Sequence, residues 1–106
     1  MAITHHVARE RLSVSTSIVS PTADTVNTTQ AAGSRSLRVV YGDFDVQDDD
    51  VRVTFDGTDP VALTTGEIWY AGEKYRVWGI HNLLLLEFIR EFGDVEIEVN
   101  YRGGKA

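Results

Sequence analysis

The chain has 106 residues and no cysteine, so it has room for one domain, and disulfide bonds and thiolate chemistry are excluded. Its net charge of −6, from 16 acidic and 10 basic residues, argues against a nucleic-acid-binding surface, which needs a basic stripe. No secretory signal precedes the first strand, and the longest apolar run, 83–86, is far short of the ~20 residues of a membrane span, so we expect a soluble protein made in the cytoplasm.

Alternation of apolar and polar side chains with period two predicts strands, and the first such run covers residues 12–18. Residues 1–9 before it are expected to form an N-terminal arm. Residues 20–36 are rich in Thr, Ser and Ala and lack apolar periodicity, so we predict an extended loop that orders against a partner. An edge strand at 25–29 is the alternative, since Thr and Val suit a pleated surface.

Two further strands are predicted in the middle of the chain, at 37–41 and 51–55. The first is expected to end in a turn at 42–43, and the three consecutive aspartates at 48–50 interrupt pairing before the second, because Asp favours turns over sheets. After the second strand, the stretch 57–60 contains glycine and proline and predicts another turn.

Aromatic side chains concentrate in one predicted β-hairpin. Its strands, 68–70 and 75–78, flank a glycine-containing loop at 71–74. Because Trp and Tyr are enriched at interface hot spots, these rings are candidates for a protein interface, although facing strands also send rings into a core. The candidate residues are Trp69, Tyr70, Tyr75 and Trp78.

Residues 81–92 fit either a helix with Asn82 as its N-cap or a strand. The neighbouring strands and the bracketing glycines favour the strand, whereas Leu and Glu favour helix by propensity. Residues 95–101 form the clearest half-exposed strand, with an acidic outer face, and 103–106 are expected to be a flexible C-terminus.

About six to eight short strands, with turn signals every 8–12 residues or so, are typical of a β-sandwich or a small jelly-roll-like barrel. We therefore predict that residues 1–106 form a single all-β domain of antiparallel strands.

The candidate chemistry is sparse. The one acidic cluster could suit calcium, but it lacks the glycine and glutamate positions of an EF-hand loop, so a solvated turn is the favoured interpretation. His5 and His6 point to opposite sides of an extended chain, and His81 is expected to be a lone, partly buried histidine. No nucleophile elbow or phosphate loop is present, so we predict no enzyme, no catalytic residues, no cofactor and no metal. The acidic cluster comprises Asp43, Asp45, Asp48, Asp49 and Asp50.

The run VRVTFDGTDP at 51–60, followed by Thr64-Thr65-Gly66 and a strand from Glu67, resembles a pattern in small structural proteins of tailed bacteriophages. The resemblance implies a small β-sandwich virion component without enzymatic activity, and no catalytic residues are carried over from it. The aromatic stretch 69–78 is bulkier than that pattern. Further matching segments are 10–16, 86–90 and 98–101.

From the resemblance we expect a head decoration or cement protein on the capsid surface, which binds the major capsid protein and further copies of itself. Binding only the assembled shell would stabilise that shell by linkage. A tail, neck or fibre-associated protein is the close alternative. A carbohydrate-binding module that uses the Trp69 and Trp78 rings is the alternative from another class.

Overall fold

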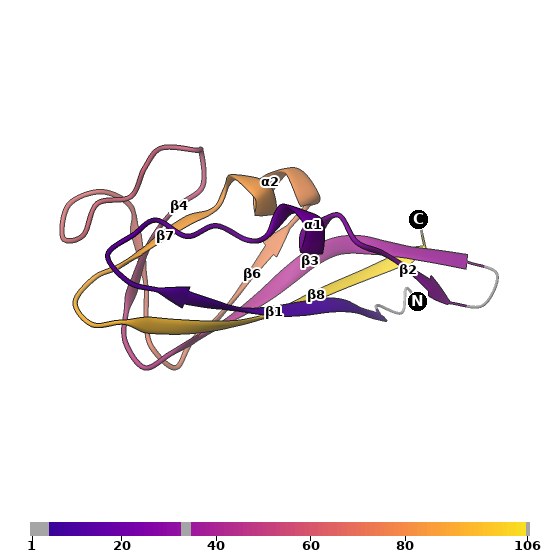
Figure 1. The fold of residues 1–106 in the computed structure, drawn as a ribbon, viewed down its shortest axis with the longest axis horizontal. Coiled ribbons are helices and arrows are strands. Elements are labelled where there is room, and N and C mark those ends of the chain that lie inside the picture. The colour runs from indigo at the N-terminus through magenta and orange to yellow at the C-terminus, as the bar shows by residue number, and fades with distance from the viewer. Residues whose placement is uncertain (1–4, 33–34, 106) are drawn as a thin grey trace.

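Two antiparallel sheets make up the molecule, as predicted for an all-β sandwich (Figure 1). A computed structural model of the chain describes residues 5–32 and 35–105. Its strands are β1 (His5–Val14), β2 (Thr29–Ala32), β3 (Arg35–Gln47), β4 (Val51–Thr54), β5 (Glu67–Trp69), β6 (Lys74–Trp78), β7 (Glu87–Arg90) and β8 (Val95–Lys105), and its helices are α1 (Ala23–Val26) and α2 (Ile80–Leu85). Sheet A has the order β1-β8-β3-β2, with β6 also paired to β3, and sheet B has the order β5-β4-β7.

The long strands β3 and β8 form the middle of sheet A. They pair from Leu37 opposite Lys105 to Gln47 opposite Glu96, and β1 pairs along the other edge of β8. The second edge of β3 is shared, with β2 along its first part and β6 along its second. Sheet A therefore has five strands but is four strands wide.

The turn predicted at 42–43 is wrong, because β3 continues through both residues. Gly42 faces the core, where a Cβ atom would lie 3.1 Å from the side chain of Leu83. Asp43 faces outwards, and its Oδ1 accepts a 2.7 Å hydrogen bond from Nε of Arg76 on β6. Two residue types that favour turns thus remain in a strand because each has a specific neighbour.

The core lies between the two sheets and under the helices. Phe44 of sheet A meets Phe88 of sheet B, with ring centroids 5.8 Å apart. The helices lie side by side over the part of sheet A that sheet B leaves open (Figure 1), and each buries an apolar side chain, Val26 and Leu83. The bulkiest fully buried side chains are Tyr101, Phe44, Phe88, Leu83, Leu86 and Ile97.

The extended loop predicted over 20–36 is wrong, because this segment contains α1 and β2. Thr22 is anchored to β1, where its hydroxyl and N–H donate to the carboxylate of Glu10 at 2.6 and 3.1 Å. The hydroxyl of Tyr101 donates to the same carboxylate at 2.5 Å, and burial together with Glu10 raises the pKa of that hydroxyl. Val26 is the one buried residue of α1, so a single apolar side chain and the shared carboxylate of Glu10 position a polar stretch.

The alternative of an edge strand was correct in kind but displaced. The strand covers Thr29–Ala32 rather than 25–29 and pairs with the start of β3. Residues 33–34 lie outside the described part of the chain.

The hairpin predicted over 68–78 is wrong, because its two strands belong to different sheets. β5 pairs with β4 in sheet B, whereas β6 pairs with β3 in sheet A. The turn between them crosses from one sheet to the other at Gly72, which has a φ of 84° and donates its N–H to the carbonyl of Val46 at 2.8 Å. The ring of Trp69 on β5 is buried in the core between the two sheets.

The segment 81–92 combines both interpretations. Residues 80–85 are helical and residues 87–90 form β7, so the strand favoured for the whole segment is wrong in its first half. Leu83 in the helix and Leu86 just after it are both fully buried, and the backbone becomes extended at Leu86. Leu86 and Phe88, two residues apart, are both fully buried, which the extended backbone after the helix allows.

Both ends of the described chain are strands. β1 begins at His5 and β8 extends to Lys105, so residues 5–9 are not an arm and 103–105 are not a flexible end. Residues 1–4 and Ala106 lie outside the described residues.

The pairing of β8 with β3 is irregular between Val39 and Tyr41, and Gly103 of β8 lies opposite Val39 at this irregularity. Only a residue without a Cβ atom fits there. A Cβ atom on Gly103 would lie 1.7 Å from the carbonyl oxygen of Arg38, whereas one on Gly104 would meet nothing within 4 Å. We expect Gly103→Ala to lower the free energy of unfolding by at least about 2 kcal/mol, because backbone must move. Gly104→Ala is the matched control. Urea denaturation with equal losses in both variants would contradict this account.

Candidate binding surfaces

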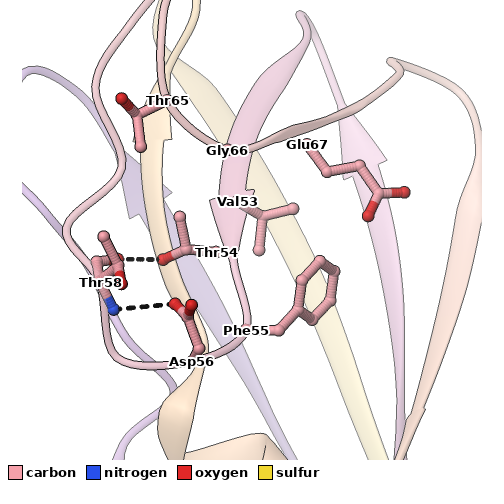
Figure 2. A pocket seen from close by; sticks show the side chains of 8 residues that line it. All are labelled: Val53, Thr54, Phe55, Asp56, Thr58, Thr65, Gly66 and Glu67. Atoms are coloured by element: carbon pink, nitrogen blue, oxygen red, sulfur yellow. Dashed lines mark hydrogen bonds between the residues drawn. The ribbon is translucent and has the colours of Figure 1, made fainter.

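The loop that joins β4 to β5 folds back over the outer face of sheet B. It begins with the sequence Asp56-Gly57-Thr58, where the carboxylate of Asp56 accepts the N–H of Thr58 at 3.0 Å. The hydroxyl of Thr54 donates to the carbonyl of Thr58, so the last residue of β4 holds the turn (Figure 2). Hydrogen bonds from the backbone and the side chain of Thr58 lower the pKa of the Asp56 carboxylate. The D-G-T stretch, which is part of the phage resemblance, is therefore the hydrogen-bonded turn near the start of this loop.

Next to this turn lies an open hollow of about 330 Å³, which Figure 2 shows between β4 and the returning loop. Figure 2 also shows Val53 and Phe55 on the same side of the strand. The ring of Phe55, which lines the hollow, packs against Trp69 with the ring centroids 5.9 Å apart.

At its tip the loop makes a tight turn from Val61 to Thr65. Each of these two residues donates its N–H to the carbonyl of the other, at 3.0 and 2.9 Å. Leu63 lies at the tip with a φ of 68°, in the left-handed region that costs a residue with a Cβ atom roughly 1 kcal/mol. Its side chain is 63% exposed. The backbone strain is therefore not offset by burial of the leucine side chain.

A buried ion pair holds this strained turn. Nε and Nη2 of Arg52 donate to the two carboxylate oxygens of Glu91 at 2.6 and 2.7 Å. The same carboxylate accepts the N–H of Leu63 at 2.9 Å, and Nη1 of Arg52 donates to the carbonyl of Gly66 at 2.9 Å. The side chains are 13% and 2% exposed, and Arg52 lowers the pKa of Glu91. The two charged side chains thus connect β4 and the residue after β7 with the middle of the turn, at Leu63, and with the residue after it, Gly66.

Three exposed apolar side chains lie on the segments that the Arg52–Glu91 pair holds, which we call the clamp. Val61, Leu63 and Phe92 are 49%, 63% and 66% exposed, and Phe92 directly follows the buried Glu91. Val61 and Phe92 line one groove of about 380 Å³, together with residues of β7 and Thr16. We call Val61, Leu63 and Phe92 the loop-end patch. Exposed apolar side chains that line a groove, as Val61 and Phe92 do, mark sites of protein interaction where they form one surface.

The four aromatic candidates separate into core and surface. Trp69 is 2% exposed and stacks on Tyr75, with ring centroids 4.4 Å apart, so it cannot anchor a partner. The hydroxyl of Tyr75 accepts the N–H of Tyr70 at 2.8 Å and fixes the turn between the sheets. Tyr70 and Trp78 are 56% and 53% exposed, but Tyr70 lies in the turn after β5 and Trp78 is the last residue of β6. The predicted aromatic platform is therefore reduced to isolated rings.

The predicted acidic cluster is dispersed. Asp43 pairs with Arg76 on the outer face of sheet A, whereas the side chains of Asp49 and Asp50 accept the N–H groups of Gly93 and Ala71 at 3.1 and 2.9 Å. The last two aspartates therefore connect neighbouring loops, which a solvated turn would not do. Within residues 5–32 and 35–105, no three His, Asp or Glu side chains gather in a way that could hold a metal ion.

His81 lies on a different element from the two adjacent histidines of β1. His81 is exposed on α2 rather than partly buried as expected, because Leu83 is the residue that the helix buries. His6 is exposed on β1, and the side chain of His5 lies outside the description.

One acidic group that the sequence did not single out is Glu87 on β7. Burial is the main cause that raises its pKa, followed by a hydrogen bond with Asp59 and by the charge of Asp56. One carboxylate oxygen of Glu87 is buried without a hydrogen-bond partner. Since these acids are distant in sequence, only the return of the loop over sheet B brings them together.

Comparison with known proteins gives no relatives: no family model, no curated protein and no solved structure matches the chain. Among the helices in the described part of the chain, none is long and apolar enough to cross a membrane.

Arg52→Met leaves the buried carboxylate of Glu91 without its cation, so we expect a loss of about 3–5 kcal/mol in the free energy of unfolding. The matched control is Arg90→Met, which breaks the exposed ion pair with Asp94 and is expected to cost less than about 1 kcal/mol. Chemical denaturation at pH 7 measures both. Similar losses would mean that the Arg52–Glu91 pair has no special role.

Glu87→Gln is expected to raise the free energy of unfolding at pH 7. The raised pKa of Glu87 means that its ionised form destabilises the fold, and that this penalty disappears as the pH falls below its folded pKa. The gain should therefore be largest at neutral pH and vanish in acid. Glu67→Gln, at an exposed position of β5, is the control. A gain that does not depend on pH would contradict the assignment.

Proposed function

We propose that the chain is a structural protein of a tailed-phage particle, a head decoration or cement protein that binds the assembled capsid through the loop-end patch. The particle is proposed from the sequence resemblance. The stretch 51–60 that carries this resemblance forms β4 and the start of the loop over sheet B. The same stretch supplies Arg52, one half of the ion pair under the patch.

The observation that supports a binding role is the conformation of Leu63. A large apolar side chain is held in the left-handed region, exposed to solvent and fixed by a buried carboxylate. Strain of this kind persists where the surrounding structure imposes it, and it concentrates at sites of function. A glycine at this position would fold with less strain, so the leucine side chain has a use that the isolated chain does not reveal.

The proposed partner is the major capsid protein. An interface centred on Leu63 and Phe92 buries apolar surface without ordering a flexible loop, because the clamp has already fixed the loop tip. Binding of the native chain to the assembled shell alone would stabilise that shell by mass action, with many copies each adding a modest contact. The acidic net charge of −6 suits the outside of a DNA-filled shell.

Further copies of the chain are a second proposed partner. β1 is an edge strand of sheet A, and its part from Ala8 to Val14, which pairs with β8 on one side, is the part proposed to pair with another chain. The expectation of a homo-oligomer rests on this edge.

Leu63→Gly separates folding from binding. It relieves the strain at a φ of 68°, so the free energy of unfolding should stay within about 1 kcal/mol of the original. Loss of the side chain should weaken binding to undecorated capsids, assembled from the major capsid protein of the same genome, at least about tenfold. Co-sedimentation and the capsid disruption temperature are the measurements.

Leu84→Ala is the control, because Leu84 is an exposed apolar residue on α2, away from the patch. If the original chain fails to co-sediment and leaves the disruption temperature unchanged, the decoration role is wrong. If Leu63→Gly binds as well as the original, the patch is not the contact. A tail, neck or fibre location would instead appear as a low copy number per particle, in a single ring rather than across the shell.

A further inference from the structure

The outer face of sheet A carries an exposed tryptophan on a rigid support. Trp78 of β6 lies opposite Tyr41 of β3. The ring centroids are 4.6 Å apart, and Trp78 remains 53% exposed while Tyr41 is 4% exposed. The indole is therefore fixed from below by the tyrosine, and much of its surface stays available to a ligand.

A charged network holds the support in place. The guanidinium of Arg76 lies over the Tyr41 ring, 4.2 Å from its centroid. The same group makes two hydrogen bonds to the carboxylate of Asp43, at 2.7 and 3.1 Å. Planar polar groups fixed in this way lose little entropy when a ligand binds.

The same face of sheet A carries a small polar pocket of about 130 Å³, formed by residues of β6, β3 and β8. Its position follows from the register of sheet A, in which Tyr41 lies opposite Arg102 and Asp43 lies opposite Asn100. Side chains on one face of a strand recur about every 7 Å, so the pocket is one step along the sheet from the Trp78 row. The residues that line the pocket are Asp43, Asp45, Lys74, Asn100 and Arg102.

The chemistry of this pocket suits a neutral ligand. Two carboxylates face two cations, and Asn100 adds a group that both donates and accepts. The five lining residues together carry no net charge, and although Arg76 on Asp43 adds one positive charge, the net charge of −6 on the whole chain disfavours a polyanion. A pyranose ring, by contrast, has an apolar C–H face that packs on an indole and hydroxyl groups that both donate and accept hydrogen bonds.

We infer that the outer face of sheet A binds a neutral polysaccharide, with one sugar ring packed on Trp78 and the hydroxyl groups of the next in the Asp43–Asn100–Arg102 pocket. This site lies apart from the loop-end patch, so a chain bound to a capsid by that patch could still bind sugar. It also differs from the module expected from the sequence, since Trp69 is buried in the core and takes no part.

The test is a titration of the full chain with maltohexaose, cellohexaose and N-acetylchitohexaose, followed by tryptophan fluorescence and by NMR of the indole N–H signals. At least one of these sugars should shift the Trp78 signal and leave that of the buried Trp69 unchanged. Trp78→Ala should raise the Kd at least about 30-fold. Tyr70→Ala, which removes an exposed ring from the turn between the sheets, should leave it unchanged.

Asn100→Ala provides a second variant that does not disturb the packed rings, and it should weaken binding of the same sugar. Thermal unfolding of each variant verifies that it is folded. The inference is overturned if no sugar of the panel binds at about 10 mM. It is also overturned if Trp78→Ala and Asn100→Ala bind as the original does, or if the chain binds heparin and none of the neutral sugars.

Discussion

The ion pair between Arg52 and Glu91 is the interaction on which the organisation of sheet B and its loop depends. A buried charge pair is costly unless every polar group around it is satisfied. Here two backbone groups add hydrogen bonds to the pair: the N–H of Leu63 donates to the carboxylate, and the carbonyl of Gly66 accepts from the guanidinium. The pair therefore acts less as a source of stability than as a geometric constraint, because only one path of the loop satisfies both charges.

This constraint explains how a small domain can present a strained leucine and a phenylalanine to solvent. Glu91 holds the backbone of Leu63 and, as the residue before Phe92, sets where that ring emerges. The sugar site inferred on sheet A has the same design in another form, since Arg76 and Asp43 fix the rings of Tyr41 and Trp78. In both places paired charges hold an apolar group that the core does not need, and the two surfaces are built from different strands.

Sequence patterns predicted the class of fold and several strands, because alternation directly reflects which face of a sheet is buried. They failed where a distant partner decides the local structure. Gly42 and Asp43 look like a turn until Leu83 and Arg76 are placed beside them. The loop-end patch was missed for the same reason: nothing near Leu63 in the sequence indicates that Glu91 will hold its N–H. Of the aromatic candidates, alternation alone could not tell that Trp69 faces inwards and Trp78 outwards.

Amide hydrogen exchange at Leu63 tests the central claim most directly, namely that the buried ion pair fixes the loop tip. The isolated chain should protect this N–H well above the level of an exposed loop. Glu91→Gln weakens the acceptor and removes the charge that holds Arg52, so the Leu63 amide should then exchange faster, while amides of β3 and β8 that remain paired should change little. Fast exchange at Leu63 in the original chain, or equal exchange in both proteins, would contradict the account.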